Sequence, residues 1–148
     1  WLAFLGTLGI RVLRNERVRI ERDGAALDIA GVDDWTAAGF GEGHGADLPR
    51  ALAGRDPAVP VLLLAHQPKA APEAARLGVD AQLSGHTHGG QIVPFNYFAR
   101  LDTPYLNGSY RVGELRLYVS PGTGYWGPPM RLGTAAEITR VTLRSAGA

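Results

Sequence analysis

Two histidines stand two positions apart inside a glycine-rich stretch, "LSGHTHGGQ", at residues 83–91. A third histidine directly follows the apolar run "PVLLLA" at residues 60–65. The neutral imidazole of histidine is the commonest protein ligand for transition metals. If the fold brings His66, His86 and His88 together, their rings can hold a metal ion. The elements that position the three histidines therefore decide the chemistry.

A strand–helix–strand pattern surrounds these histidines. Residues 60–66 are apolar up to the histidine, as in a strand buried on both faces, and "VDAQLSGH" at residues 79–86 predicts a second strand. Between them, "APEAARLG" predicts a short helix that ends at its glycine. Strands joined by such a crossover are usually parallel neighbours, so their carboxyl ends share one sheet edge. Open α/β sheets bind ligands just beyond that edge, where all three histidines are expected.

The glycines of the motif suit a binding site. Gly85, Gly89 and Gly90 permit backbone angles closed to other residues and leave room for a bound group. If this segment is extended, residues two apart point the same way, so His86 and His88 face one pocket and Thr87 points away. A lone histidine is more often an ordinary exposed or hydrogen-bonded residue, and we interpret His44, in the loop "DDWTAAGFGEGHG", in that way.

The remaining patterns predict a small α/β domain. A helix is expected over residues 2–8, a hairpin turning at Asp23-Gly24, and a short helix with Asp47 as its N-cap. A second hairpin is expected to turn near Gly113. Residues 92–104 are predicted to be a loop, and "EITRVTLR" at residues 137–144 alternates like a half-exposed strand.

Composition excludes several classes of protein. The 148 residues include no cysteine, which removes disulfides, thiolate metal sites and cysteine nucleophiles. A net charge of +1 gives no support to a nucleic-acid-binding surface. No apolar run reaches the roughly 18 residues that span a bilayer. Because the sequence opens at Trp1, we interpret it as an interior piece of a longer chain, and both a cytoplasmic and a membrane-associated location stay open.

Four stretches together resemble a known family. "LLLAHQP" and "GVDAQLSGHTHGGQ", supported by "IAGVDD" and "AAEITRVTL", are similar to the C-terminal half of the calcineurin-like metallophosphoesterases. The motif Gly-His-Thr-His-Gly-Gly-Gln most resembles a bacterial branch, and the likeness covers nearly the whole chain. It implies an α/β fold of the α+β sandwich type, with mixed sheets in four α-β-β-α layers. Residues 1–148 would then be the C-terminal portion of one such domain.

The resemblance implies a dinuclear phosphoesterase. His66 and His86 would bind one divalent ion and His88 the other, with no further catalytic residue in this stretch. Two such ions hold phosphate oxygens while a metal-bound hydroxide attacks phosphorus, which hydrolyses a phosphodiester or pyrophosphate. Manganese, zinc, iron or nickel suit imidazole ligands. The implied substrates are small phosphate esters or nucleotide-linked lipids rather than nucleic acid, and membrane association of the longer protein is compatible with them.

The sequence departs from the family in one respect. The family's Asp-x-His, Gly-Asp-x-x-Asp and Gly-Asn-His motifs do not occur, so we expect them before Trp1. The alternative is a non-catalytic or vestigial metal-binding domain, and the upstream coding sequence distinguishes the two.

Two further motifs allow more than one interpretation. Asp33 and Asp34 are either hydrogen-bonding residues near the site or, as we favour, residues of a turn. "GTGYWG" at residues 122–127 matches a dinucleotide-binding pattern, but Pro128-Pro129 stands where the required helix begins. A loop that packs Tyr125 and Trp126 near the histidines is the favoured interpretation.

Overall fold

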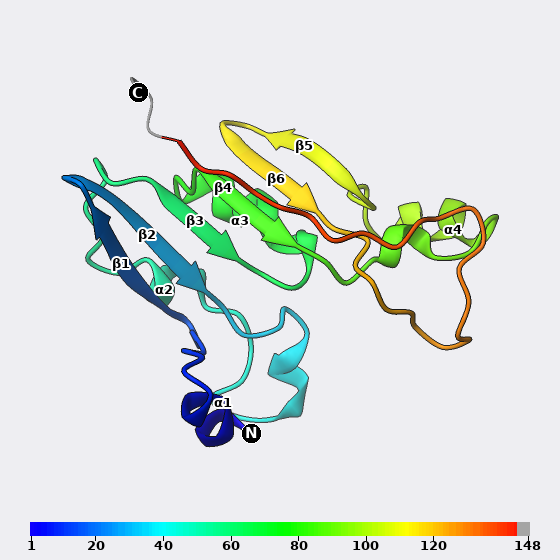
Figure 1. The fold of residues 1–148 in the computed structure, drawn as a ribbon, viewed down its shortest axis with the longest axis horizontal. Coiled ribbons are helices and arrows are strands. Elements are labelled where there is room, and N and C mark those ends of the chain that lie inside the picture. Colours follow the sequence, from blue (N-terminus) through cyan, green and yellow to red (C-terminus); the bar gives the residue numbers. More distant parts are fainter. Residues whose placement is uncertain (145–148) are drawn as a thin grey trace.

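The computed structural model describes residues 1–144, and residues 145–148 lie outside the described part. One six-stranded sheet, in the order β1-β2-β3-β4-β6-β5, organises the chain (Figure 1). The strands are β1 Glu16–Arg22, β2 Ala25–Gly31, β3 Val61–Leu64, β4 Ala81–Ser84, β5 Gly108–Val112 and β6 Leu115–Val119. The α-helices are α1 Leu2–Thr7, α2 Leu48–Ala51, α3 Ala71–Arg76 and α4 Phe95–Asp102. Short 3-10 helices cover Ala37–Phe40, Pro68–Ala70 and His88–Gly90.

The centre of the sheet is parallel and its edges are antiparallel. β2, β3, β4 and β6 run the same way, while β1 and β5 are joined to their neighbours as hairpins. The register pairs Leu63 with Gln82 across β3 and β4. The carboxyl ends of β3 and β4 therefore meet at one edge, and the predicted α/β fold with a mixed sheet is confirmed.

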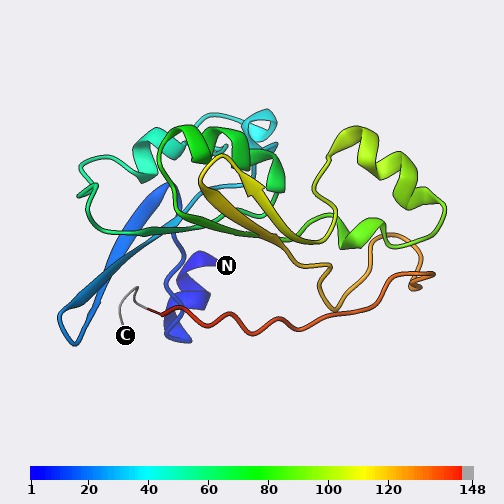
Figure 2. The same cartoon turned by 90° about the horizontal axis from the view of Figure 1, so that it is seen from above.

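The two faces of the sheet are covered differently. Helices α2 and α3 lie on one face, and the buried core forms between them and the strands (Figure 2). Its fully buried leucines are Leu48, Leu63, Leu115 and Leu117. The opposite face carries α1 and the extended C-terminal segment. Alternation along β3 turns Leu64 toward this second face, where it stays 42% exposed.

Most local sequence signals lie where they were predicted. Asp23 and Gly24 both have positive φ, the geometry of a two-residue hairpin turn. The Asp47 carboxylate accepts a hydrogen bond from the Arg50 amide at 2.9 Å and caps α2. Gly78, with φ of 74°, follows the end of α3.

Two predicted elements are wrong. Residues 92–104 contain α4 instead of a continuous loop; Phe95, Phe98 and Leu101 recur at helical spacing, and two prolines in this stretch obscured the pattern. Residues 137–144 alternate like a strand but pair with no described strand. They run along the second face rather than beside an edge of the sheet, so no neighbouring backbone can form a ladder with them (Figure 2).

A buried carboxylate joins β1 to β2. Asp28 has no exposed surface and accepts hydrogen bonds from Arg19 Nε at 2.9 Å and Arg17 Nη1 at 3.2 Å. The hydrogen bond from Arg19, opposed by burial, holds the pKa of Asp28 below its ordinary value. Because the folded pKa is depressed, this pair stabilises the fold above the ordinary pKa of aspartate, and the contribution is lost as pH falls through the lowered value.

We expect Asp28→Asn to lower the free energy of unfolding by about 2 kcal/mol at neutral pH. The loss stays below that of a fully buried pair because both arginines keep some solvent contact. Asp23→Asn is the matched control, since its pair with Arg22 is almost fully exposed. Urea unfolding followed by circular dichroism measures both variants, and equal midpoints at neutral pH would contradict the assignment.

Candidate metal centre and adjoining pocket

The ends of β3 and β4 bring two histidines into contact. The carbonyl of His66 accepts a hydrogen bond from the Gly85 amide at 3.0 Å, which extends the pairing of the two strands by one step. The residues that follow then stand opposite each other. His66 Nε2 and His86 Nδ1 are 3.3 Å apart, and the two rings meet edge to face with centroids 5.1 Å apart.

This spacing suits a shared ion. Two imidazole nitrogens bound to one metal at about 2.1 Å, at angles between a right angle and a tetrahedral one, lie about 3.0–3.4 Å apart. The same spacing also allows one ring to donate an N–H···N hydrogen bond to the other. Burial, together with the neighbouring His66, holds the pKa of His86 below its ordinary value, although the residue remains solvent-exposed. The neutral ring is the form that binds metals.

The histidine motif is a tight turn, so the predicted extended geometry is wrong. His86 and His88 have φ of 71° and 50°, while Thr87 is helical, with φ of −76°. The Thr87 hydroxyl donates to the Leu106 carbonyl instead of pointing away from the site. Non-glycine residues at positive φ cost on the order of 1–3 kcal/mol and concentrate at functional sites.

His88 contacts Arg131 and does not contact the other two histidines of the trio. Arg131 Nη1 donates to the His88 carbonyl at 3.0 Å, and Arg131 Nη2 lies 3.5 Å from His88 Nδ1. Among residues 1–144, no group of three histidine, aspartate, glutamate or cysteine side chains is placed to hold a metal ion as it stands. The structure thus brings His66 and His86 into contact and puts His88 nearby, on the lining of the same pocket as His86.

Curated relatives share this chain's sequence over nearly its full length. A bovine (Bos taurus) protein named "Transmembrane protein with metallophosphoesterase domain" is 49% identical over 99% of the chain, and a Danio rerio protein of the same name is 42% identical over 99%. A Helicobacter pylori protein named "Uncharacterized metallophosphoesterase" is 40% identical over 96%. The chain belongs to the calcineurin-like metallophosphoesterases. No family model matches it, and no solved structure does.

The metallophosphoesterase relatives extend well beyond this chain. It spans 35%, 35% and 38% of the three relatives' lengths, about a third of each. They come from animals as well as from a bacterium, so the likeness is not restricted to the bacterial branch that the motif indicated. Across residues 1–144, no helix combines the length and apolar character needed to cross a bilayer.

The two aspartates after β2 of this metallophosphoesterase chain both form side-chain hydrogen bonds. Asp33 pairs with Arg14 at 2.5 Å, and the hydrogen bond from Arg14 keeps the pKa of Asp33 low. Asp34 Oδ1 accepts hydrogen bonds from Thr36 and, at 2.9 Å, from Gln67 Nε2. Burial opposes ionisation of Asp34, yet these hydrogen bonds hold its pKa below the ordinary value. Asp33 behaves as the turn residue that the sequence favoured, whereas Asp34, through Gln67 next to His66, also fits the alternative of a hydrogen-bonding residue near the site.

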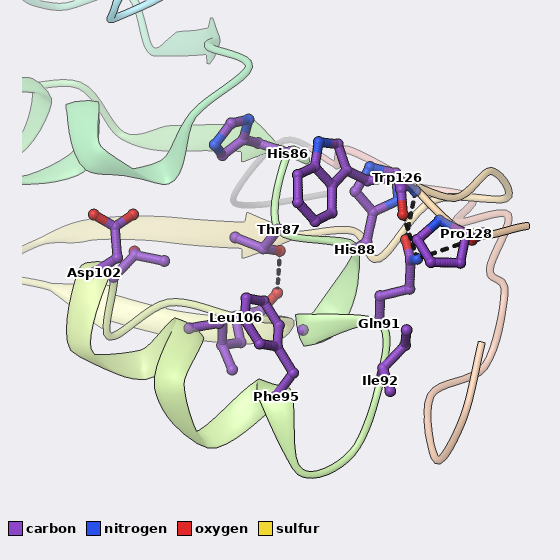
Figure 3. A pocket seen from close by; sticks show the side chains of 13 residues that line it. His86, Thr87, His88, Gln91, Ile92, Phe95, Asp102, Leu106, Trp126 and Pro128 are labelled. Atoms are coloured by element: carbon purple, nitrogen blue, oxygen red, sulfur yellow. Dashed lines mark hydrogen bonds between the residues drawn. The ribbon is translucent and has the colours of Figure 1, made fainter. Parts of the chain in front are cut away.

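A pocket of about 610 Å³ adjoins the histidines (Figure 3). His86, Thr87 and His88 form one part of its wall, and α4 and the loop after β6 form the rest. Its remaining lining residues are Gly90, Gln91, Ile92, Phe95, Ala99, Asp102, Thr103, Leu106, Trp126 and Pro128. Of the aromatic pair expected near the site, Trp126 lines the pocket, whereas Tyr125 is not part of its lining.

Sequence reasoning missed three contributors to this pocket. Residues of α4 were overlooked because the stretch was taken for a loop, although its aromatic spacing is helical. Gln91 ends the histidine motif and Arg131 belongs to no motif; their contacts join segments 35 and 43 residues apart, which a single sequence does not reveal. Residues 120–131 contain no helix, in agreement with the interpretation of "GTGYWG" as a loop.

Proposed function

We propose that the protein carrying this chain is a metal-dependent phosphoesterase that hydrolyses phosphodiester or pyrophosphate bonds at a two-metal site. The observation that carries the proposal is the 3.3 Å contact between His66 Nε2 and His86 Nδ1 at the carboxyl edge of the sheet. The names of the relatives support the reaction class. In this proposal His66 and His86 hold one ion and His88 holds the other. When bound, such ions polarise phosphate oxygens and activate water.

The chain's own residues orient this site. The hydrogen bond between Gly85 and His66 fixes the two strand ends, so the facing nitrogens need little rearrangement to share a ligand. The Arg131 guanidinium anchors the backbone of His88 by donating to its carbonyl. Because arginine only donates, its contact with Nδ1 makes that nitrogen an acceptor and keeps the ring proton on Nε2, so the ring must turn away from Arg131 before a nitrogen can bind an ion. The apolar pocket beside His86 offers space for the ester group.

We infer further that residues 1–148 form the C-terminal portion of a single domain, whose remaining ligands come from an upstream portion. Two facing imidazoles and a third nearby are too few ligands for two ions. The second face of the sheet supports this inference, because it is apolar at Leu64 and carries Ile138 in an 89% exposed position. A second layer packed there would give the four-layer arrangement of the family. The transmembrane names of two relatives make membrane association of the longer protein part of the proposal.

Metal removal tests the function. We expect the longer protein to hydrolyse bis(p-nitrophenyl) phosphate, to lose at least about 99% of the rate when a chelator strips its metal, and to recover with manganese or zinc. Elemental analysis before and after stripping counts the ions. Unchanged hydrolysis by a verified metal-free protein would contradict the proposal. Stoichiometric metal without hydrolysis of any phosphodiester or pyrophosphate would favour the non-catalytic alternative instead.

A further inference from the structure

The pocket beside the histidines is largely apolar, and the polar side chains in its wall already bond to other residues of the chain. The Thr87 hydroxyl donates to the Leu106 carbonyl, and Asp102 pairs with Lys69 at 2.7 Å. The Thr103 hydroxyl accepts from the Tyr105 amide. A ligand entering the pocket therefore meets few free hydrogen-bonding groups apart from the histidine rings and the exposed carboxylate of Asp102.

Trp126 forms the outer wall of the pocket, and the side chain of Gln91 hydrogen-bonds to its backbone. Gln91 Nε2 donates to the Trp126 carbonyl at 2.6 Å, and the Trp126 amide donates to Gln91 Oε1 at 2.5 Å. The carboxamide thus forms the paired hydrogen bonds that a neighbouring strand would form. Gln91 itself is only 6% exposed, so this connection is screened from water.

These two hydrogen bonds position the backbone of Trp126 and leave its side chain free to contact a ligand. The Trp126 residue is 70% exposed, although it lines the pocket. Figure 3 shows its indole on one side of the pocket and the Phe95 ring of α4 on the other. Ile92, Ala99 and Leu106 complete a largely hydrophobic enclosure next to His86.

We propose that this pocket binds an alkyl or acyl group of the phosphate ester, and that Trp126, positioned by Gln91, determines the specificity for that group. The inference rests on the proposed phosphoesterase function, because it places the hydrolysed phosphate at the histidines. Burying methylene groups against such a wall favours binding, whereas a nucleobase edge would lose its hydrogen bonds to water without replacement. Phosphate esters with long hydrocarbon chains are therefore preferred over nucleotide esters.

Three p-nitrophenyl phosphodiesters test the preference in the longer protein with its metals: the methyl, the decyl and the 5′-thymidine ester. We expect kcat/KM for the decyl ester to exceed that for the methyl ester by about 10- to 100-fold, mainly through KM, below the micellar concentration. Trp126→Ala should reduce the decyl-to-methyl ratio by about tenfold, and Gln91→Ala should reduce it in the same direction. Tyr125→Ala, which removes a 58% exposed aromatic ring from outside the pocket, is the matched control and should preserve the ratio.

A binding measurement separates this inference from the phosphoesterase proposal. Decyl phosphate is titrated calorimetrically into chelator-treated protein, where no turnover occurs, and Trp126→Ala should weaken its binding about tenfold relative to Tyr125→Ala. If Trp126→Ala fails to fold, Ala99→Phe fills the pocket from α4 and should exclude the same ligand. Hydrolysis with equal kcat/KM for the methyl and decyl esters, or a preference for the thymidine ester, would overturn the pocket assignment alone. Trp126-dependent binding without any hydrolysis would overturn the phosphoesterase function alone.

Discussion

Replacing His86 with alanine is expected to lower the rate of phosphodiester hydrolysis by the longer protein by about 10³-fold or more. His86 Nδ1 faces His66 Nε2 at 3.3 Å, so its removal leaves the proposed ion at this position with one imidazole from this chain. Loss of a direct ligand removes the charge that stabilises the transition state, whereas loss of a residue that only hydrogen-bonds to a ligand typically costs 10- to 100-fold. Steady-state hydrolysis of bis(p-nitrophenyl) phosphate and the metal content per protein are measured together.

His44→Ala is the control for this prediction. His44 is the chain's one histidine that we do not assign to the metal centre, and it lies exposed in the loop between β2 and α2. Its replacement should change the hydrolysis rate by less than about twofold, since surface substitutions away from a site usually have small effects. If His86→Ala retained the wild-type rate and metal content, the 3.3 Å histidine pair would be a hydrogen bond of structural origin.

The sequence predicted that His66 and His86 meet at one edge of the sheet, because two strong local rules combine there. A buried apolar strand, a crossover helix and a second strand lead to parallel pairing, and parallel pairing puts His66 and His86 at one edge. The hairpin at Asp23-Gly24 and the cap at Asp47 were predictable for a similar reason, since their conformations depend on neighbours in sequence.

The pocket was not predictable, because its contacts are long-range. The histidine turn departs from an extended strand because His86, His88 and Gln91 adopt positive φ. Their residue types alone do not predict this conformation. The Gln91–Trp126 and Arg131–His88 contacts then connect this turn to the loop after β6, which contains "GTGYWG". Residues 137–144 have the alternation of a strand, but alternation supplies no pairing partner, and only the fold shows that they lie across a face.

The last prediction concerns residues 1–148 produced alone. We expect this chain to show no measurable phosphodiesterase activity and to bind divalent metal weakly. His66 and His86 place two imidazoles together, while His88 contacts Arg131. Among residues 1–144, no carboxylate or further imidazole is placed to join the pair as a third ligand. Two ions about 3.5–4 Å apart repel each other, so a dinuclear site needs a bridging anionic ligand.

The same chain alone should associate through its uncovered sheet face. β3 is paired on both sides, so its backbone offers no open edge. The exposed apolar groups lie instead on the second face, at Leu64 and along residues 138–143. Such a surface drives self-association until something covers it. Leu64→Lys should therefore shift the chain toward monomer in analytical ultracentrifugation without restoring activity.

Two tightly bound ions per isolated chain, with turnover that His88→Ala abolishes, would show that this sequence holds every ligand the reaction needs.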